Sequence, residues 1–114
     1  MSVAFLEVGP VVVVKPDRAV YEGGECDAME MRLMELVRRG ASIVVDLSRV
    51  RSLTAHCVGV LAHAQMHASK SGASIVLCGA SLCQRRLMEA MGLIEVLPHF
   101  ENSADAVRSF TPVA

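Results

Sequence analysis

The sequence predicts an α/β fold: one mixed, mostly parallel sheet of four to five strands with about four helices. Two observations predict it. Short runs rich in valine and isoleucine alternate with longer segments whose apolar residues recur every three or four positions. Glycine directly follows most of the longer segments, as it does at the end of many helices. A length of 114 residues suits one domain, so residues 1–114 are expected to fold as a single unit.

The chain is predicted to begin with a hairpin. Phe5 to Val8 and Val11 to Lys15 are short apolar runs, and Gly9 with Pro10 between them is typical of a turn. The first strand is therefore expected to run antiparallel at one edge of the sheet.

Four segments have the helical period and are expected to form helices: Cys26–Arg39, Ala55–Ser71, Leu82–Met91 and Ser103–Phe110. Gly40, Gly72 and Gly92 follow the first three and are expected to end them, because glycine adopts the left-handed conformation at little cost. Asp105 lies in the first turn of the last helix, where a carboxylate is favoured.

Three further strands are expected, at Ile43–Leu47, Ser74–Cys78 and, briefly, Glu95–Leu97 before Pro98. Because a helix separates each strand from the next, the connections are crossovers and these strands should run parallel. The residues expected to share one core are Val44, Leu47, Leu61, Val76 and Leu87.

The composition argues against several classes of function. A net charge of -1, 4% aromatic residues and no tryptophan leave no basic surface or stacking platform for nucleic acid. No apolar run reaches the roughly 20 residues of a membrane helix, and no signal peptide is recognisable, so a cytoplasmic protein without membrane insertion is expected. The four cysteines form no Cys-x-x-Cys pair and are expected to be small apolar residues in a reducing compartment.

Catalysis is not expected. The chain has no glycine-rich phosphate-binding loop, and so no cofactor is predicted. His56 and Cys57 are neighbours on a predicted helix, where side chains point about 100° apart and cannot pair as base and nucleophile. Asp46 is the one carboxylate candidate at a buried strand.

The segment from Ile43 to Leu61 resembles the core signature of STAS domains, a family of anti-sigma-factor antagonists and of the regulatory tails of sulfate transporters. The chain keeps the residues Asp46, Leu47, Ser48, Val50, Leu53 and Leu61 of that signature. It departs where the family has Asp-Ser-Ser-Gly: the residues here are Thr54, Ala55, His56 and Cys57. The resemblance implies a STAS-type fold in which Asp46 organises a turn.

The same resemblance implies an altered regulation. The second serine of the family motif is the phosphorylated one, and its counterpart is His56, so the usual serine phosphorylation is not expected. Thr54 is interpreted as the N-cap of the helix that follows it, in preference to a displaced phosphoacceptor.

His56, His63 and His67 share one stripe of the Ala55–Ser71 helix, since offsets of 7 and 11 residues return to within about 20°. The buried stripe is expected to be another, formed by Val58, Leu61, Ala62, Gln65 and Ala68. In the family this region contacts a kinase-like anti-sigma factor. The resemblance therefore implies partner binding through Thr54, Ala55, His56, Cys57, Val60, His63 and His67.

The expected function is that of a non-catalytic binding domain whose partner is an anti-sigma factor or a related kinase-like regulator, with homodimerisation left open. One alternative is a structural STAS subunit of a transporter or of a large sensory complex. Another is a ligand or metal sensor that uses the histidine stripe. His63 and His67 are four residues apart, but two imidazoles without a nearby carboxylate or thiol make a weak site, so no metal is expected.

Overall fold

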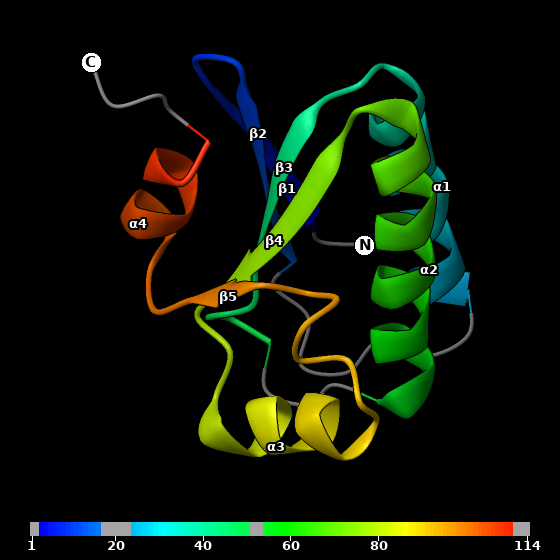
Figure 1. Cartoon of the computed structure of the whole chain (residues 1–114), viewed down its shortest axis with the longest axis vertical. Coiled ribbons are helices and arrows are strands. Elements are labelled where there is room, and N and C mark those ends of the chain that lie inside the picture. The colour runs from blue at the N-terminus through cyan, green and yellow to red at the C-terminus, as the bar shows by residue number, and fades with distance from the viewer. Residues whose placement is uncertain (1–2, 17–23, 51–53, 111–114) are drawn as a thin grey trace.

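The computed structural model describes residues 3–16, 24–50 and 54–110, and within these ranges five strands form one sheet beside four helices (Figure 1). The strands are β1 (Val3–Val8), β2 (Val11–Pro16), β3 (Ser42–Asp46), β4 (Ser74–Cys78) and β5 (His99–Phe100). The helices are α1 (Gly24–Arg38), α2 (Ala55–Ser71), α3 (Leu82–Ala90) and α4 (Ser103–Arg108). This α/β architecture confirms the predicted fold class.

The order of the strands in the sheet, β1-β2-β3-β4-β5, is their order in the chain. The β1–β2 hairpin is antiparallel and places β1 at an edge, as predicted, while β2, β3, β4 and β5 pair in parallel. Right-handed crossovers that all step in one direction place their helices on one face of the sheet. Figure 1 shows α1 and α2 side by side on that face, α3 beyond the lower end of β4, and α4 on the opposite face.

Glycines with positive φ stand just after the ends of the first three helices, as predicted. α2 ends at Ser71, as predicted, because Gly72 has φ 75° and its N–H donates to the carbonyl of Ala68. Gly40 and Gly92, with φ 72° each, follow α1 and the last turn after α3.

The predicted strand at Glu95–Leu97 is wrong. The backbone N–H groups of Val96 and Leu97 both donate to the carbonyl of Leu93, so this segment is a turn. Pairing with β4 begins at Pro98, whose carbonyl accepts from the N–H of Leu77 at 2.8 Å. Proline lacks an N–H but can still accept at the start of an edge strand, so it opens β5 and does not end it.

The core has two parts, and the expectation of one shared core is also wrong. The larger part includes Leu47 and Leu61, with Leu87 packed against it. Val44 and Val76 point to the other face of the sheet and pack near Ala106 of α4. The cause is the alternation of side chains along a strand, which sends neighbouring residues to opposite faces.

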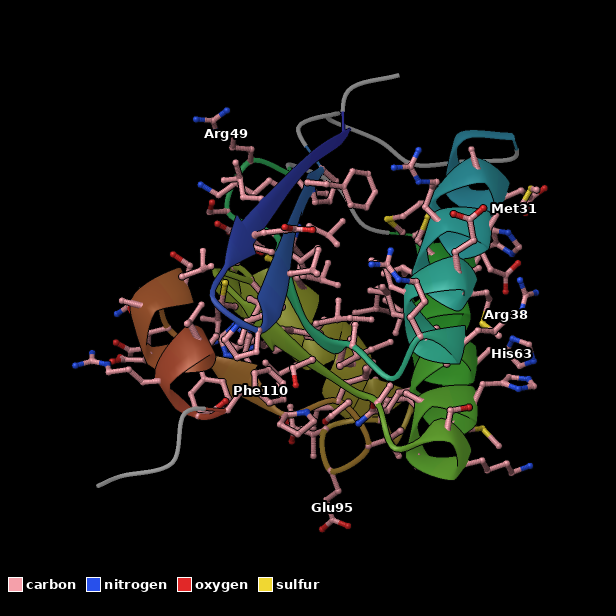
Figure 2. All side chains as sticks on the ribbon, turned by 90° about the horizontal axis from the view of Figure 1, so that it is seen from above. Met31, Arg38, Arg49, His63, Glu95 and Phe110 are labelled. Atoms are coloured by element: carbon pink, nitrogen blue, oxygen red, sulfur yellow. The ribbon has the colours of Figure 1, made fainter. Side chains whose placement is uncertain are left out.

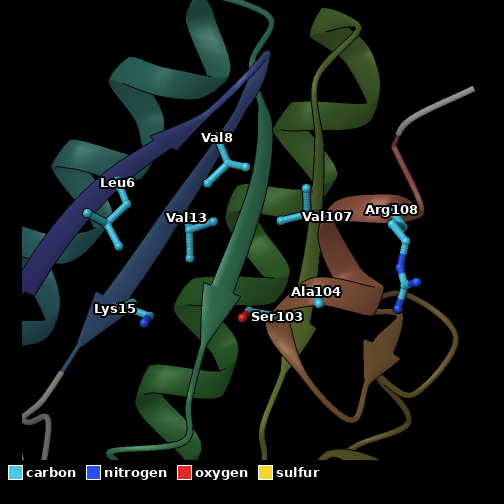
Figure 3. Close-up of a pocket in the computed structure, with 8 residues that line it drawn as sticks. All are labelled: Leu6, Val8, Val13, Lys15, Ser103, Ala104, Val107 and Arg108. Carbon is cyan, nitrogen blue, oxygen red and sulfur yellow. The ribbon is translucent and has the colours of Figure 1, made fainter.

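The face that carries α4 is only half covered. α4 packs against β3, β4 and β5, and beside it an apolar groove of about 510 Å³ remains open over the hairpin (Figure 3). The apolar groove is lined by Leu6, Val8, Val13, Ala104 and Val107, with Ser103 and the cationic Lys15 and Arg108 beside them. None of the helices in the described ranges combines the length and hydropathy needed to cross a bilayer.

Candidate functional site

The turn that leaves β3 is organised by Asp46, the last residue of that strand. Only 7% of Asp46 is exposed, and its Oδ1 accepts from the N–H of Ser48 at 2.9 Å. The N–H of Leu47 donates to the carbonyl of Cys78 at 2.8 Å, which extends the pairing with β4. Lys15 brings its Nζ to 4.0 Å from Oδ2 of Asp46. The turn-organising role implied for Asp46 is confirmed by this geometry.

The turn that leaves β4 is locked against the first one. Gly79 has φ 71°, and a Cβ at this position would lie 2.9 Å from Cβ of Ser48 and 3.0 Å from Oδ1 of Asp46. The buried amide of Gln84 donates from Nε2 to the carbonyl of Val50 at 2.8 Å. Its Oε1 accepts from the N–H of Ser81 at 2.9 Å, within the capping box of α3. These two turns, called the edge turns below, hold each other in place.

The thiol of Cys78, which lies at the end of β4 beside the edge turns, is not prepared as a nucleophile. Burial raises the pKa of the Cys78 thiol to about 12, and the neighbouring carboxylate of Asp46 adds to the rise. A thiol with that pKa stays protonated at neutral pH and is unreactive. Cys57 is fully buried while His56 is exposed, so this pair is not a base and nucleophile either.

The first turn of α2 is capped by Thr54. Its backbone is extended, with φ -79° and ψ 158°, and its hydroxyl accepts from the N–H of Cys57 at 3.2 Å. This is the N-cap geometry, and it confirms the predicted capping role of Thr54. Ser52 and Leu53, which precede it, lie outside the described residues.

The stripe of His56, His63 and His67, called the histidine face below, is exposed as predicted. The side chains of His56 and His63 are 61% and 58% accessible. Two other residues of the predicted docking set are not at the surface: Cys57 is 0% exposed and Val60 6%. Both contribute to the main core. The sheet and the neighbouring helices cover a wider arc of α2 than the buried stripe that was predicted from the sequence.

The sequence reasoning missed the contribution of α1, which packs against α2. Asp27 Oδ1 lies 3.9 Å from Nε2 of His56, and Glu30 Oε2 lies 3.4 Å from Nδ1 of His63. Met31 is 69% exposed on the same helix, and Figure 2 shows it on the side of the molecule that carries His63 and Arg38. The helical period of α1 marks these residues as non-core, but it does not say which part of α2 they approach.

Metal ligands are sparse across residues 3–16, 24–50 and 54–110. No cluster of three or more His, Cys, Asp or Glu side chains in these ranges is arranged to hold an ion. The closest approach of two candidate ligands on the histidine face is that of His63 and His67, whose Nε2 atoms are 3.2 Å apart.

The comparison with known families decides the identity. The family model described as "Mlab, STAS domain" matches residues 23–98. The chain belongs to the STAS domain family. No curated protein matches the sequence.

Solved STAS structures share the fold over nearly the whole chain. An anti-sigma factor antagonist from Mycobacterium paratuberculosis superposes with a TM-score of 0.85 at 20% identity, covering 97% of this chain and 94% of the other. A STAS domain protein from Planctomyces limnophilus gives 0.82 at 13% identity, covering 96% and 98%. The murine Solute Carrier 26 family member A9 anion transporter gives 0.72 at 17% identity, covering 91% of this chain and 18% of the transporter. Identities this low show a common STAS fold.

Proposed function

We propose that this STAS domain is a cytoplasmic, non-catalytic regulator that binds an anti-sigma factor or a related kinase-like protein and is not switched by serine phosphorylation. The observation that carries the proposal is at His56. The STAS signature aligns this residue with the phosphorylated serine, and here it is an exposed imidazole 3.9 Å from the carboxylate of Asp27. An imidazole at a helix N-terminus does not reproduce the negative charge of a phosphate.

Binding is favoured over catalysis by how the polar groups of the edge turns are used. Asp46, Ser81 and Gln84 each hold backbone groups of the two turns. Within the described residues, no buried side-chain nitrogen or oxygen lacks a hydrogen-bond partner. These groups therefore stabilise the fold and leave no buried polar atom directed at a substrate.

The docking surface in this proposal combines the exposed face of α2 with the adjoining side of α1. Ala55, His56, His63 and His67 remain from the sequence-derived set, with Thr54 at the cap. Met31 and Met66 add flexible apolar contact area, since they are 69% and 58% exposed. Methionine is enriched at protein interfaces and adapts to different partner shapes.

The partner can be identified by capture from native lysate and then tested as a purified protein. We expect the combined variant His56→Glu with Met31→Asp to lower the affinity at least tenfold, because it places two new carboxylates on the docking surface. Glu95→Lys, an exposed change at a distant part of the molecule (Figure 2), serves as the matched control and should bind as wild type does. Equal binding by all three proteins would place the interface elsewhere.

The regulatory part has its own test. Incubation with the kinase-like partner and ATP should leave the wild-type chain unlabelled, while His56→Ser should accept phosphate, because a serine then occupies the signature position. Thr54→Ala in the His56→Ser background controls for labelling of the cap residue. Stoichiometric phosphate on Thr54 of the wild-type chain, accompanied by weaker partner binding, would overturn the phospho-insensitive reading.

A second candidate function is that of a STAS subunit in a transporter assembly. Two observations favour it. The fold is shared with part of an anion transporter, and the side chains of Leu6 and Val8, which line the apolar groove, are 48% and 47% exposed. An apolar segment of a transporter subunit would fill that groove. Co-purification with a membrane protein that is lost in Leu6→Asp and kept in His56→Glu would favour this function over the first.

A further inference from the structure

The side chains of His63 and His67 converge on one point beside α2. They are four residues apart, so they lie one above the other on the helix surface. Their Nε2 atoms are 3.2 Å apart, and their rings meet edge to face, with centroids separated by 4.6 Å and planes inclined at 78°. Both side chains are exposed, so the point on which they converge is open to solvent.

This nitrogen–nitrogen separation fits two ligands of one metal ion. With metal–nitrogen bonds of about 2.0–2.1 Å, two ligands of a tetrahedral centre lie about 3.3–3.4 Å apart, and two ligands at right angles about 2.9 Å apart. The observed 3.2 Å falls between these values. In the metal-free protein the same distance allows one imidazole to donate a hydrogen bond to the other, and binding an ion would replace that bond once the rings turn both Nε2 lone pairs toward the metal.

Glu30 of α1 provides the nearby carboxylate that the sequence alone did not place beside the two imidazoles. Its Oε2 lies 3.4 Å from Nδ1 of His63, on the side of the ring away from His67. A carboxylate beside Nδ1 favours the tautomer with the proton on Nδ1, which leaves Nε2 free to coordinate. In protein zinc sites a carboxylate on this side of a histidine ring orients the imidazole and is not itself a ligand, and Glu30 is near enough to take that positioning role.

We propose that Nε2 of His63 and Nε2 of His67 bind a divalent transition-metal ion, with Glu30 orienting the ring of His63. Imidazole suits Zn²⁺, Ni²⁺ and Cu²⁺, and Cu²⁺ should bind most tightly of the three. The described residues offer no third protein ligand, so water completes the coordination and the ion exchanges freely. The site is a property of this chain alone and does not depend on the proposed partner.

The test uses the full chain after removal of metal, titrated with CuCl₂, NiCl₂ or ZnCl₂ in a non-chelating buffer and followed by calorimetry. We expect saturation at one ion per chain. His63→Ala and His67→Ala should each weaken binding at least tenfold. Glu30→Ala should weaken it about 10–100-fold, as the loss of such positioning groups does elsewhere. In a heteronuclear NMR spectrum, Cu²⁺ should broaden the imidazole signals of His63 and His67 first.

Matched controls separate this site from other potential ligands. Glu35→Ala removes a second carboxylate of α1, His56→Ala removes the third member of the histidine face, and Cys83→Ser removes an exposed thiol. All three should bind metal as wild type does. Binding that persists in the double variant His63→Ala with His67→Ala, or no saturable binding at all, overturns the site. An unchanged affinity in Glu30→Ala overturns the role of the carboxylate.

Discussion

The edge turns and the histidine face differ in how firmly their residues are held. In the edge turns, hydrogen bonds of 2.8 to 3.1 Å join backbone and buried side-chain groups within and between two loops, and a Cβ on Gly79 would lie 2.9 to 3.0 Å from its neighbours. On the histidine face, exposed side chains meet at 3.2 to 3.9 Å. The residues Asp46, Leu47 and Ser48, which carry much of the family resemblance, therefore serve the fold. The exposed α2 residues that follow, His56, His63 and His67, are expected to change their chemistry without loss of the fold.

The largest loss of stability is expected for Gly79→Ala, which tests how firmly the edge turns are held. The substitution adds left-handed backbone strain of roughly 1–2 kcal/mol and a contact at 2.9 Å that costs about 1–3 kcal/mol more. Gly72→Ala is the matched control, because Gly72 has φ 75° but nothing within 4 Å of an added Cβ. Urea unfolding should show a clearly larger loss of unfolding free energy for Gly79→Ala than for Gly72→Ala. Equal losses would mean that the edge turns rearrange at little cost.

A smaller loss is expected for Thr54→Ala, at the boundary between the two regions. Removing the hydroxyl that accepts from the N–H of Cys57 should cost about 1 kcal/mol of unfolding free energy. Thr54→Ser keeps the cap and should change stability by no more than a few tenths of a kcal/mol. A wild-type-like Thr54→Ala would show that the cap contributes little to folding.

Gly59→Ala should have the opposite sign. Gly59 lies inside α2 between His56 and His63, and an added Cβ would meet nothing within 4 Å. Replacing glycine by alanine in a helix interior stabilises by roughly 0.5–1 kcal/mol. A higher midpoint in thermal unfolding would confirm that this face tolerates change, whereas a lower one would reveal packing against α1.

The smallest effect concerns pH and the edge turns. Burial, and then the charge of Arg85, lower the pKa of His99, and Glu101 opposes them. The Nε2 of His99 accepts from the N–H of Ala80 at 3.1 Å, which requires the neutral ring. Below the ordinary histidine pKa of about 6.5, the unfolded chain therefore binds more protons than the folded one, and stability falls as pH falls. Unfolding free energies at pH 7.5 and 5.5 should differ less in His99→Gln than in wild type.

Most of the fold could be predicted from local patterns. The bounds of α2 and β4 follow directly from the positions of Gly72 and of the β-branched run, since such signals act within a few residues. β5 was missed because it contains two residues and exists only through its pairing with β4. A strand of that length has no periodicity of its own to detect.

The candidate site was predictable on one helix but not between two. A rotation of about 100° per residue is sufficient to place His56, His63 and His67 on one side of the helix, and the polar character of that side predicts their exposure. The neighbouring positions of Asp27 and Glu30 depend on the register between α1 and α2, which side-chain packing sets. For the same reason the burial of Cys57 and Val60 was not anticipated.

The strand order has a consequence for how the protein is made. Because each strand pairs with the strands that precede and follow it in the chain, the sheet can grow outward from the β1–β2 hairpin while synthesis continues. No late strand has to insert between two that are already paired, so the sheet of a nascent intermediate grows at one edge, the newest strand, while β1 stays at the other edge. α4 follows all five strands in the chain, so it can cover Val44 and Val76 on the second face only after the sheet is complete.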